Sequence, residues 1–127
     1  MIAVGIGFQG RATGAEIVDA IDVALAAKAI GRNDIGMLAT ARFKRGSLAL
    51  SEAASKLGVA IRYLDEQALQ RCEARLLTYS KTSSARTGVS CLSEAAALAA
   101  LDGDGCLLAP RLVHGPVTCA LATGNAS

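Results

Sequence analysis

The stretch Met1–Ala15, MIAVGIGFQGRATGA, decides how the rest of the chain is arranged. It begins with β-branched residues that alternate with small ones, a pattern that favours a buried strand. Gly5 and Gly7 have no Cβ, so that backbone or a ligand can approach closely where this strand ends. The stretch therefore predicts a buried strand that leads into a glycine-rich turn.

A short polar loop, Gln9-Gly10-Arg11, follows the strand and leads into a helix. Thr13 and Glu16 have the spacing of a capping box, which marks a helix start. Free N–H groups and the helix dipole at such a terminus attract anions. The N-terminal stretch therefore predicts one wall of a binding site for an acidic small molecule.

Length and composition limit the class of protein. A chain of 127 residues, 52% of them hydrophobic, favours one domain over residues 1–127 with a sizeable core. Aromatic residues make up only 3%, which argues against the exposed ring platforms of RNA-reading and single-strand-binding proteins. Thirteen basic and eleven acidic residues give a net charge of +2, too balanced for a general DNA binder. We expect no nucleic-acid partner.

The cysteines do not form a metal-binding pattern. Cys72, Cys91, Cys106 and Cys119 are far apart, and the chain has one histidine, so we predict reduced, buried thiols, no metal and no cofactor. The sequence has no signal-peptide pattern and no apolar run of about 18 residues, the length needed to span a membrane. We therefore expect a cytoplasmic protein without a membrane partner.

Beyond the first strand, helices and strands alternate along the chain. The predicted elements are a helix over 14–29 with Gly31 at its C′ position, a strand over 35–41, a helix from cap Ser47 to Gly58, a strand over 59–64, a helix from Asp65 to about Leu76, a loop over 78–87, a helix over 91–101, and strands over 106–109 and 117–122.

This alternation predicts an α/β fold. We expect a single three-layer αβα domain with a mixed, mainly parallel sheet of about five strands. The last two strands are predicted to form an antiparallel hairpin with a turn at His114-Gly115-Pro116. Ligands of such sheets bind beyond the carboxyl ends of the parallel strands.

Three basic or hydroxyl-rich loops, each before a helix, are expected at that edge. Converging cations and N–H donors suit carboxylates or phosphates, whereas solvated surface is the simpler explanation for any single loop. The candidate ligand-binding residues are Gly5, Gly7, Gln9, Gly10 and Arg11 from the first loop, Thr40 and Lys44 from the second, and Lys81, Ser83, Ser84, Arg86, Thr87 and Gly88 from the third.

Other chemistries are less well supported. Gly5-x-Gly7-x-x-Gly10 has the form of a dinucleotide fingerprint, but basic residues stand where that fold needs an acidic one after its second strand. The Asp102–Gly105 segment lacks the ligands of a calcium loop and is predicted to be a turn. His114 fits a surface residue better than a general base. The catalytic residues are therefore unknown, and whether the protein is an enzyme stays open.

These segments together resemble the CobE family of cobalamin biosynthesis, which is similar to the C-terminal domain of CbiG, a hydrolase. The resemblance covers nearly the whole chain, and it is carried by VGIG, by LAT with a following Lys44, by LGVAIRYLDEQAL, by Gly88-Val89 leading to SEAAAL, by CLLAPR and by VTCALA.

The resemblance implies a small α/β protein that binds a precorrin-type tetrapyrrole, whose acetate and propionate carboxylates would suit the basic loops. It places the family's glycine-rich loop at Gly5, Gly7 and Gly10, and its Thr and Lys at Thr40 and Lys44. The chain departs from the family at Phe8-Gln9-Gly10, where relatives often have a cysteine and two basic residues, and at Arg45-Gly46, where they often have an acidic one.

Three functions remain open from the sequence. The first is an accessory or carrier protein that binds the corrin precursor. The second is an enzyme that acts on the same class of molecule, such as a lactone hydrolase of the CbiG kind. The third is a module that binds other corrin-pathway enzymes through an exposed Ala/Leu face on Ser90–Leu101.

Overall fold

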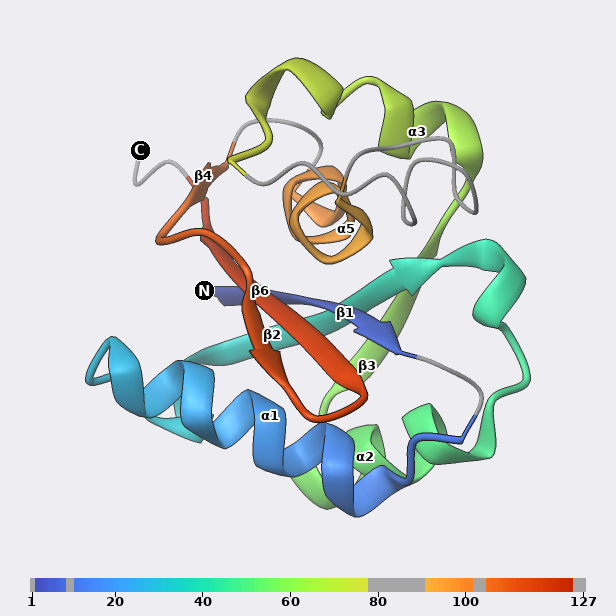
Figure 1. The fold of residues 1–127 in the computed structure, drawn as a ribbon, viewed down its shortest axis with the longest axis vertical. Helices are drawn as coiled ribbons and strands as arrows, with labels where there is room; N and C mark the ends of the chain where they lie inside the picture. Colours follow the sequence, from blue (N-terminus) through green and yellow to red (C-terminus); the bar gives the residue numbers. More distant parts are fainter. Residues whose placement is uncertain (1, 9–10, 78–90, 102–104, 125–127) are drawn as a thin grey trace.

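A six-stranded sheet forms the centre of the protein (Figure 1). The computed structural model describes residues 2–8, 11–77, 91–101 and 105–124. The strand order is β3-β2-β1-β6-β4, and β5 also pairs with β6. The strands are β1 (Ile2–Phe8), β2 (Ile35–Ala41), β3 (Ala60–Leu64), β4 (Cys106–Leu107), β5 (Leu112–His114) and β6 (Val117–Thr123).

The three N-terminal strands run parallel. β1 pairs with β2, and β2 pairs with β3, each in parallel. Helices α1 (Gly14–Ala27) and α2 (Leu48–Leu57) connect them and cover one face of the sheet (Figure 1). Two successive right-handed crossovers in the same direction put both helices on the same face. This arrangement brings the carboxyl ends of β1, β2 and β3 to one edge.

Strand β6 runs antiparallel to that group, and β4 and β5 in turn run antiparallel to β6. β6 pairs with β1 along its whole length, from Ile2 opposite Thr123 to Phe8 opposite Val117. The prediction of antiparallel strands at the end of a mixed sheet is confirmed. The sequence did not reveal β5, which forms the hairpin with β6, and His114 lies in this strand rather than in the turn. Gly115, with a φ of 59°, makes the turn.

Helix α5 (Leu92–Ala100) covers the opposite face of the sheet and gives the domain its third layer (Figure 1). It packs on β1, β2 and β6, and α3 (Glu66–Gln70) lies against its other side. Every residue of α5 is buried, including Ser93 and Glu94. The prediction of an exposed face on this helix is therefore wrong for Leu92–Ala100, because the sheet and α3 enclose it.

The helix ends agree with the sequence in α2 and differ in α1. The Oγ of Ser47 accepts a hydrogen bond from the N–H of Leu50, and Gly58 is left-handed at the C-terminus of α2, as predicted. Helix α1 ends earlier than predicted, and Ala29 takes the left-handed conformation with a φ of 55°. Gly31 has a φ of −90°, so its predicted role at the helix end is wrong.

Two predicted elements are shorter than expected. The helix after Asp65 ends at Gln70, and a separate 3-10 turn, η3, covers Glu73–Arg75. The strand predicted over 106–109 ends at Leu107, although the N–H of Leu108 still donates to Leu121. The predicted loop over 78–87 and most of the predicted Asp102–Gly105 turn lie outside the described residues. Cys72, Cys91 and Cys119 are buried as predicted, whereas Cys106 is exposed.

Candidate site at the carboxyl edge of the sheet

A side chain of the second predicted loop reaches the carboxyl end of β1. The Nζ of Lys44, in the 3-10 turn η2 (Arg42–Lys44), donates to the carbonyl oxygen of Phe8 at 2.7 Å. The same ammonium lies 4.5 Å from the centre of the Phe8 ring, within cation–π range. The end of β1 therefore holds the Lys44 charge at this edge.

Thr40 and Gly7 help to build the strand ends. The Oγ1 of Thr40 is fully buried and donates to the carbonyl oxygen of Ile6 at 2.8 Å, which ties β2 to β1. A Cβ at Gly7 would lie 2.5 Å from the Oγ1 of Thr118, a neighbour on β6 that donates to the Gly7 carbonyl at 3.3 Å. Thr40 and Gly7 thus contact neighbouring strands of the sheet, and their role described here is to hold the strand ends together.

Gly5 has a packing role. A Cβ there would lie 1.8 Å from the carbonyl oxygen of Ser93 and 2.7 Å from the nitrogen of Ala97, both in the backbone of α5. The close approach that this glycine permits is that of helix α5. The expectation that Gly5 lets a ligand approach is corrected, because the helix backbone fills the space.

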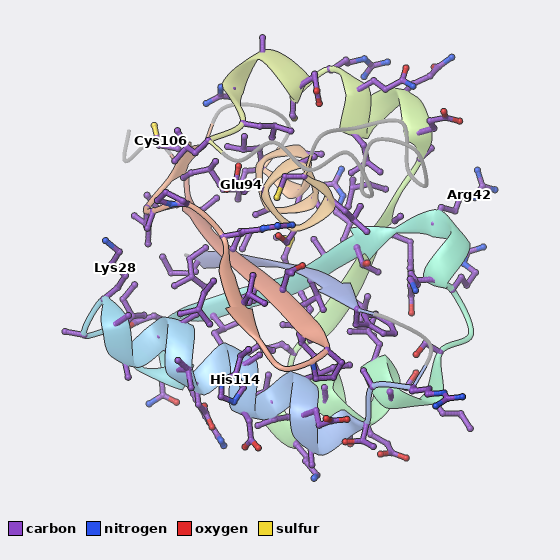
Figure 2. All side chains as sticks on the ribbon, viewed as in Figure 1. Lys28, Arg42, Glu94, Cys106 and His114 are labelled. Atoms are coloured by element: carbon purple, nitrogen blue, oxygen red, sulfur yellow. The ribbon has the colours of Figure 1, made fainter. Side chains whose placement is uncertain are left out.

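The segments that follow β1 and β2 carry further exposed cations. Arg11 precedes α1 and is exposed, as are Arg42 and Arg45. Figure 2 shows Arg42 directed away from the body of the protein. The guanidinium of Arg45 lies 5.6 Å from the ring centre of Tyr63. The segment before α1 and the segment after β2 therefore both present positive charge to solvent.

Two carboxylates beside this edge, those of Glu16 and Asp65, are engaged in helix caps. The carboxylate of Glu16 accepts from the backbone N–H of Thr13 at 2.9 Å, and the Oγ1 of Thr13 accepts from the N–H of Glu16 at 3.1 Å. This predicted capping box is confirmed. Asp65 caps α3 by accepting from the N–H of Ala68 at 2.8 Å. The capping box occupies the backbone N–H groups of Thr13 and Glu16 and places the Glu16 carboxylate at the start of α1. Attraction of an anion to this edge therefore comes from the basic side chains and not from the start of the helix.

Several candidate residues lie outside the described part of the chain. They are Gln9 and Gly10 of the first loop, and Lys81, Ser83, Ser84, Arg86, Thr87 and Gly88 of the third. Their contribution to the site therefore stays a prediction.

One buried carboxylate was not singled out from the sequence. Glu94 lies in α5 (Figure 2), and its side chain is fully buried. Its Oε1 accepts from the N–H of Leu77 at 2.6 Å, and its Oε2 accepts from the N–H of Arg111 at 2.8 Å. The signal was a single carboxylate inside the otherwise apolar run LSEAAALAA. Glu94 therefore connects α5 to a chain segment that precedes it, at Leu77, and to one that follows it, at Arg111.

The arrangement at the edge supports binding of anions. Lys44 offers an ammonium held by the carbonyl and the ring of Phe8, and Arg11 and Arg42 offer exposed guanidinium groups suited to carboxylates.

No helix among the described residues is long and apolar enough to cross a bilayer.

Comparisons with known proteins identify the family. A family model described as "Cobalamin synthesis G C-terminus" matches residues 2–122. The fold is similar to CobE, a protein from the cobalamin (vitamin B12) biosynthetic pathway, with a TM-score of 0.91 and 26% identity over 96% of this chain and 89% of CobE. The chain has no significant match among curated proteins.

Two further structures are similar. Cobalamin biosynthesis protein chiG from Agrobacterium tumefaciens has a TM-score of 0.79 and 34% identity over 99% of this chain and all of that one. A cobalamin biosynthesis protein G homolog from Sulfolobus solfataricus has a TM-score of 0.75 and 25% identity, and the match covers 96% of this chain but 36% of that protein. The chain therefore belongs to the family of the cobalamin synthesis G C-terminus, a family of cobalamin biosynthesis proteins.

Proposed function

We propose that this protein binds a polycarboxylated precorrin-type tetrapyrrole at the carboxyl edge of β1 and β2, as an accessory or carrier protein of cobalamin biosynthesis. The observation that carries the proposal is the Lys44 ammonium, which is fixed at the end of β1 by the Phe8 carbonyl and ring. A cation that is already positioned loses less conformational freedom when it pairs with a carboxylate.

The charges around Lys44 support the same ligand. Arg11 and Arg42 are exposed, and neither takes part in an ion pair within the described residues. A macrocycle with several acetate and propionate arms could contact more than one of these cations at once. Exposed pairs are individually weak, so binding by this edge depends on several of them acting together.

The proposal can be tested with uroporphyrin, a porphyrin whose side chains all end in carboxylates. We expect a saturable change in its visible spectrum when the full chain is added. The double variant Arg11→Ala/Lys44→Ala is expected to weaken binding about tenfold, as the loss of two partly screened ion pairs predicts. Added salt is expected to weaken binding by the wild-type protein as well.

A matched control removes the same charge at the other end of the molecule. Lys28 follows the last residue of α1, Lys56 lies in the last turn of α2, and both are exposed. Both helices start near the carboxyl edge and run away from it; Figure 2 shows Lys28 and Arg42 on opposite sides. Equal weakening by Lys28→Ala/Lys56→Ala, or no saturable spectral change at all, would reject the proposed edge.

A second incubation, with a different molecule, distinguishes a carrier from an enzyme. Mass spectrometry of a lactone-bearing precorrin intermediate after single-turnover mixing is expected to recover it with unchanged mass. A mass change that depends on the protein would instead establish hydrolysis and replace the carrier function.

A further inference from the structure

A basic pocket lies on another part of the protein than the Lys44 edge, the name used here for the carboxyl ends of β1 and β2 with Lys44. It is a pocket of about 350 Å³ between β3, the segment from α3 to η3, and the C-terminal end of α5. Three arginines line it, Arg62 from β3, Arg71 from the end of α3 and Arg75 from η3. Among the described lining residues none is acidic. The pocket therefore concentrates positive charge on the face of the sheet opposite to α1 and α2.

Backbone carbonyls hold two of these guanidinium groups. The Nη1 of Arg62 donates to the carbonyl oxygen of Ala100 at 2.7 Å, and the Nη2 of Arg75 donates to the carbonyl oxygen of Gly105. A guanidinium carries five N–H donors in a rigid fork, so one bond to a carbonyl sets the direction of the whole group. The wall of the pocket is thus ordered by the fold itself.

The thiol of Cys72 lines the pocket close to two of the arginines. Burial raises the pKa of Cys72, and the nearby charges of Arg75 and Arg71 act in the opposite direction. Cys72 itself lines the pocket, between these two arginines in the sequence. Both guanidinium groups therefore act on the same small volume, where an anion would interact with them together.

The remaining lining residues are apolar. Leu64, Ala68 and Ala99 contribute hydrocarbon surface between the arginines. Such a surface suits the carbon atoms of an organic acid better than inorganic phosphate, which keeps its water. Guanidinium groups match a carboxylate through two parallel hydrogen bonds.

We propose that this pocket is a binding site for a small organic carboxylate, held by Arg71 with Arg62 and Arg75 over the apolar residues. The pocket uses none of the residues assigned to the Lys44 edge, so this site stands independently of the tetrapyrrole proposal. The ligand class is a di- or tricarboxylic acid.

Citrate is a suitable probe for the test. Calorimetric titration of the full chain at low salt is expected to show saturable binding of citrate and much weaker binding of inorganic phosphate. Arg71→Ala is expected to weaken citrate binding about tenfold, the size of effect expected for the loss of a charge-assisted hydrogen bond. Arg71 is exposed and makes no side-chain hydrogen bond within the described residues, so its replacement leaves the fold intact.

Two controls separate this site from general charge effects and from the Lys44 edge. Lys56→Ala removes the same charge from α2 on the other face and is expected to leave citrate binding unchanged, as is Arg11→Ala. NMR spectra of the wild-type protein are expected to show citrate-dependent shifts of the Arg71 and Arg75 side-chain signals. Absence of saturable citrate binding, equal affinity for phosphate, or equal loss in the Lys56 variant would overturn the assignment.

Discussion

Glu94 is a charged residue in the middle of a hydrophobic layer. Its side chain is fully buried, yet both carboxylate oxygens accept backbone N–H bonds, from Leu77 and from Arg111. Two acceptors facing two donors satisfy groups that would otherwise be buried without partners. The residue therefore stabilises two chain segments that lie far from each other in the sequence.

Glu94→Gln tests this role at nearly constant volume. The amide has one acceptor oxygen, and its NH₂ group would face a backbone N–H, so that two donors are left opposed. We expect the free energy of unfolding to fall by about 2–3 kcal/mol, measured by chemical denaturation. Glu52→Gln, at an exposed position of α2, is the control and is expected to change it by less than about 0.5 kcal/mol. A similar loss in both variants would contradict a specific role for Glu94.

At the scale of elements, α1 ends with an alanine, Ala29, in the left-handed conformation that glycine usually adopts at a helix C-terminus. The N–H of Ile30 donates to the Leu25 carbonyl at 2.9 Å, and the N–H of Ala29 donates to the Ala26 carbonyl at 3.2 Å. These are the two bonds of a Schellman motif with Ala29 in the left-handed position. Ile30 packs against the core, as the hydrophobic contact of this motif requires.

Ala29→Gly is expected to stabilise the protein. A left-handed conformation costs a residue with a Cβ about 1–2 kcal/mol, and glycine adopts it without that strain. Part of this gain is offset because glycine is more flexible in the unfolded chain, so we expect an increase of about 0.5–1 kcal/mol in unfolding free energy.

The control at this helix end has the opposite sign. Ala26 is exposed and lies inside α1, where a glycine is expected to destabilise by about 0.5–1 kcal/mol. Thermal and denaturant unfolding of both variants would measure the difference. Destabilisation by Ala29→Gly would show that the end of α1 does not hold this conformation in solution.

At the scale of the whole molecule, local patterns predicted the elements better than the contacts between them. The boundaries of β2, the Ser47 cap and the Gly58 end followed from periodicity and from side chains that act on their own backbone. The end of α1 did not, because the packing of half-buried Ile30 against the core contributes to where the helix stops. Strand β5 was missed because it is short and mostly exposed, and its pairing with β6 decides its conformation.

The candidate site shows the same division. Basic residues after β1 and β2 pointed to one edge, and the structure brings Lys44 to the end of β1. The sequence indicated a close approach at Gly5 but could not tell a ligand from a helix, since α5 lies about ninety residues further along the chain. The pocket lined by Arg62, Arg71 and Arg75, here called the arginine pocket, was not predicted because its walls come from three separate elements.

Alkylation of the four free cysteines can test whether the layers on the two faces of the sheet unfold together. Cys119 lies in the core on the α1 and α2 face, Cys72 follows α3 and lies in the core around α5, Cys91 is the N-cap of α5, and Cys106 is exposed on β4. The reactive form of cysteine is the thiolate, and burial raises the pKa of Cys119 to about 12. In the native protein we therefore expect rapid alkylation of Cys106 alone.

The buried thiols are expected to react only when the domain opens. A chain of this size with one shared sheet should unfold cooperatively, so Cys72, Cys91 and Cys119 should become labelled over the same range of denaturant. Pulsed alkylation followed by peptide mass spectrometry measures each site, and Cys106→Ser is expected to remove only the rapid reaction. Labelling of Cys72 at lower denaturant than Cys119 would mean that the α3 and α5 layer opens first. The arginine pocket would then belong to the less stable half of the molecule.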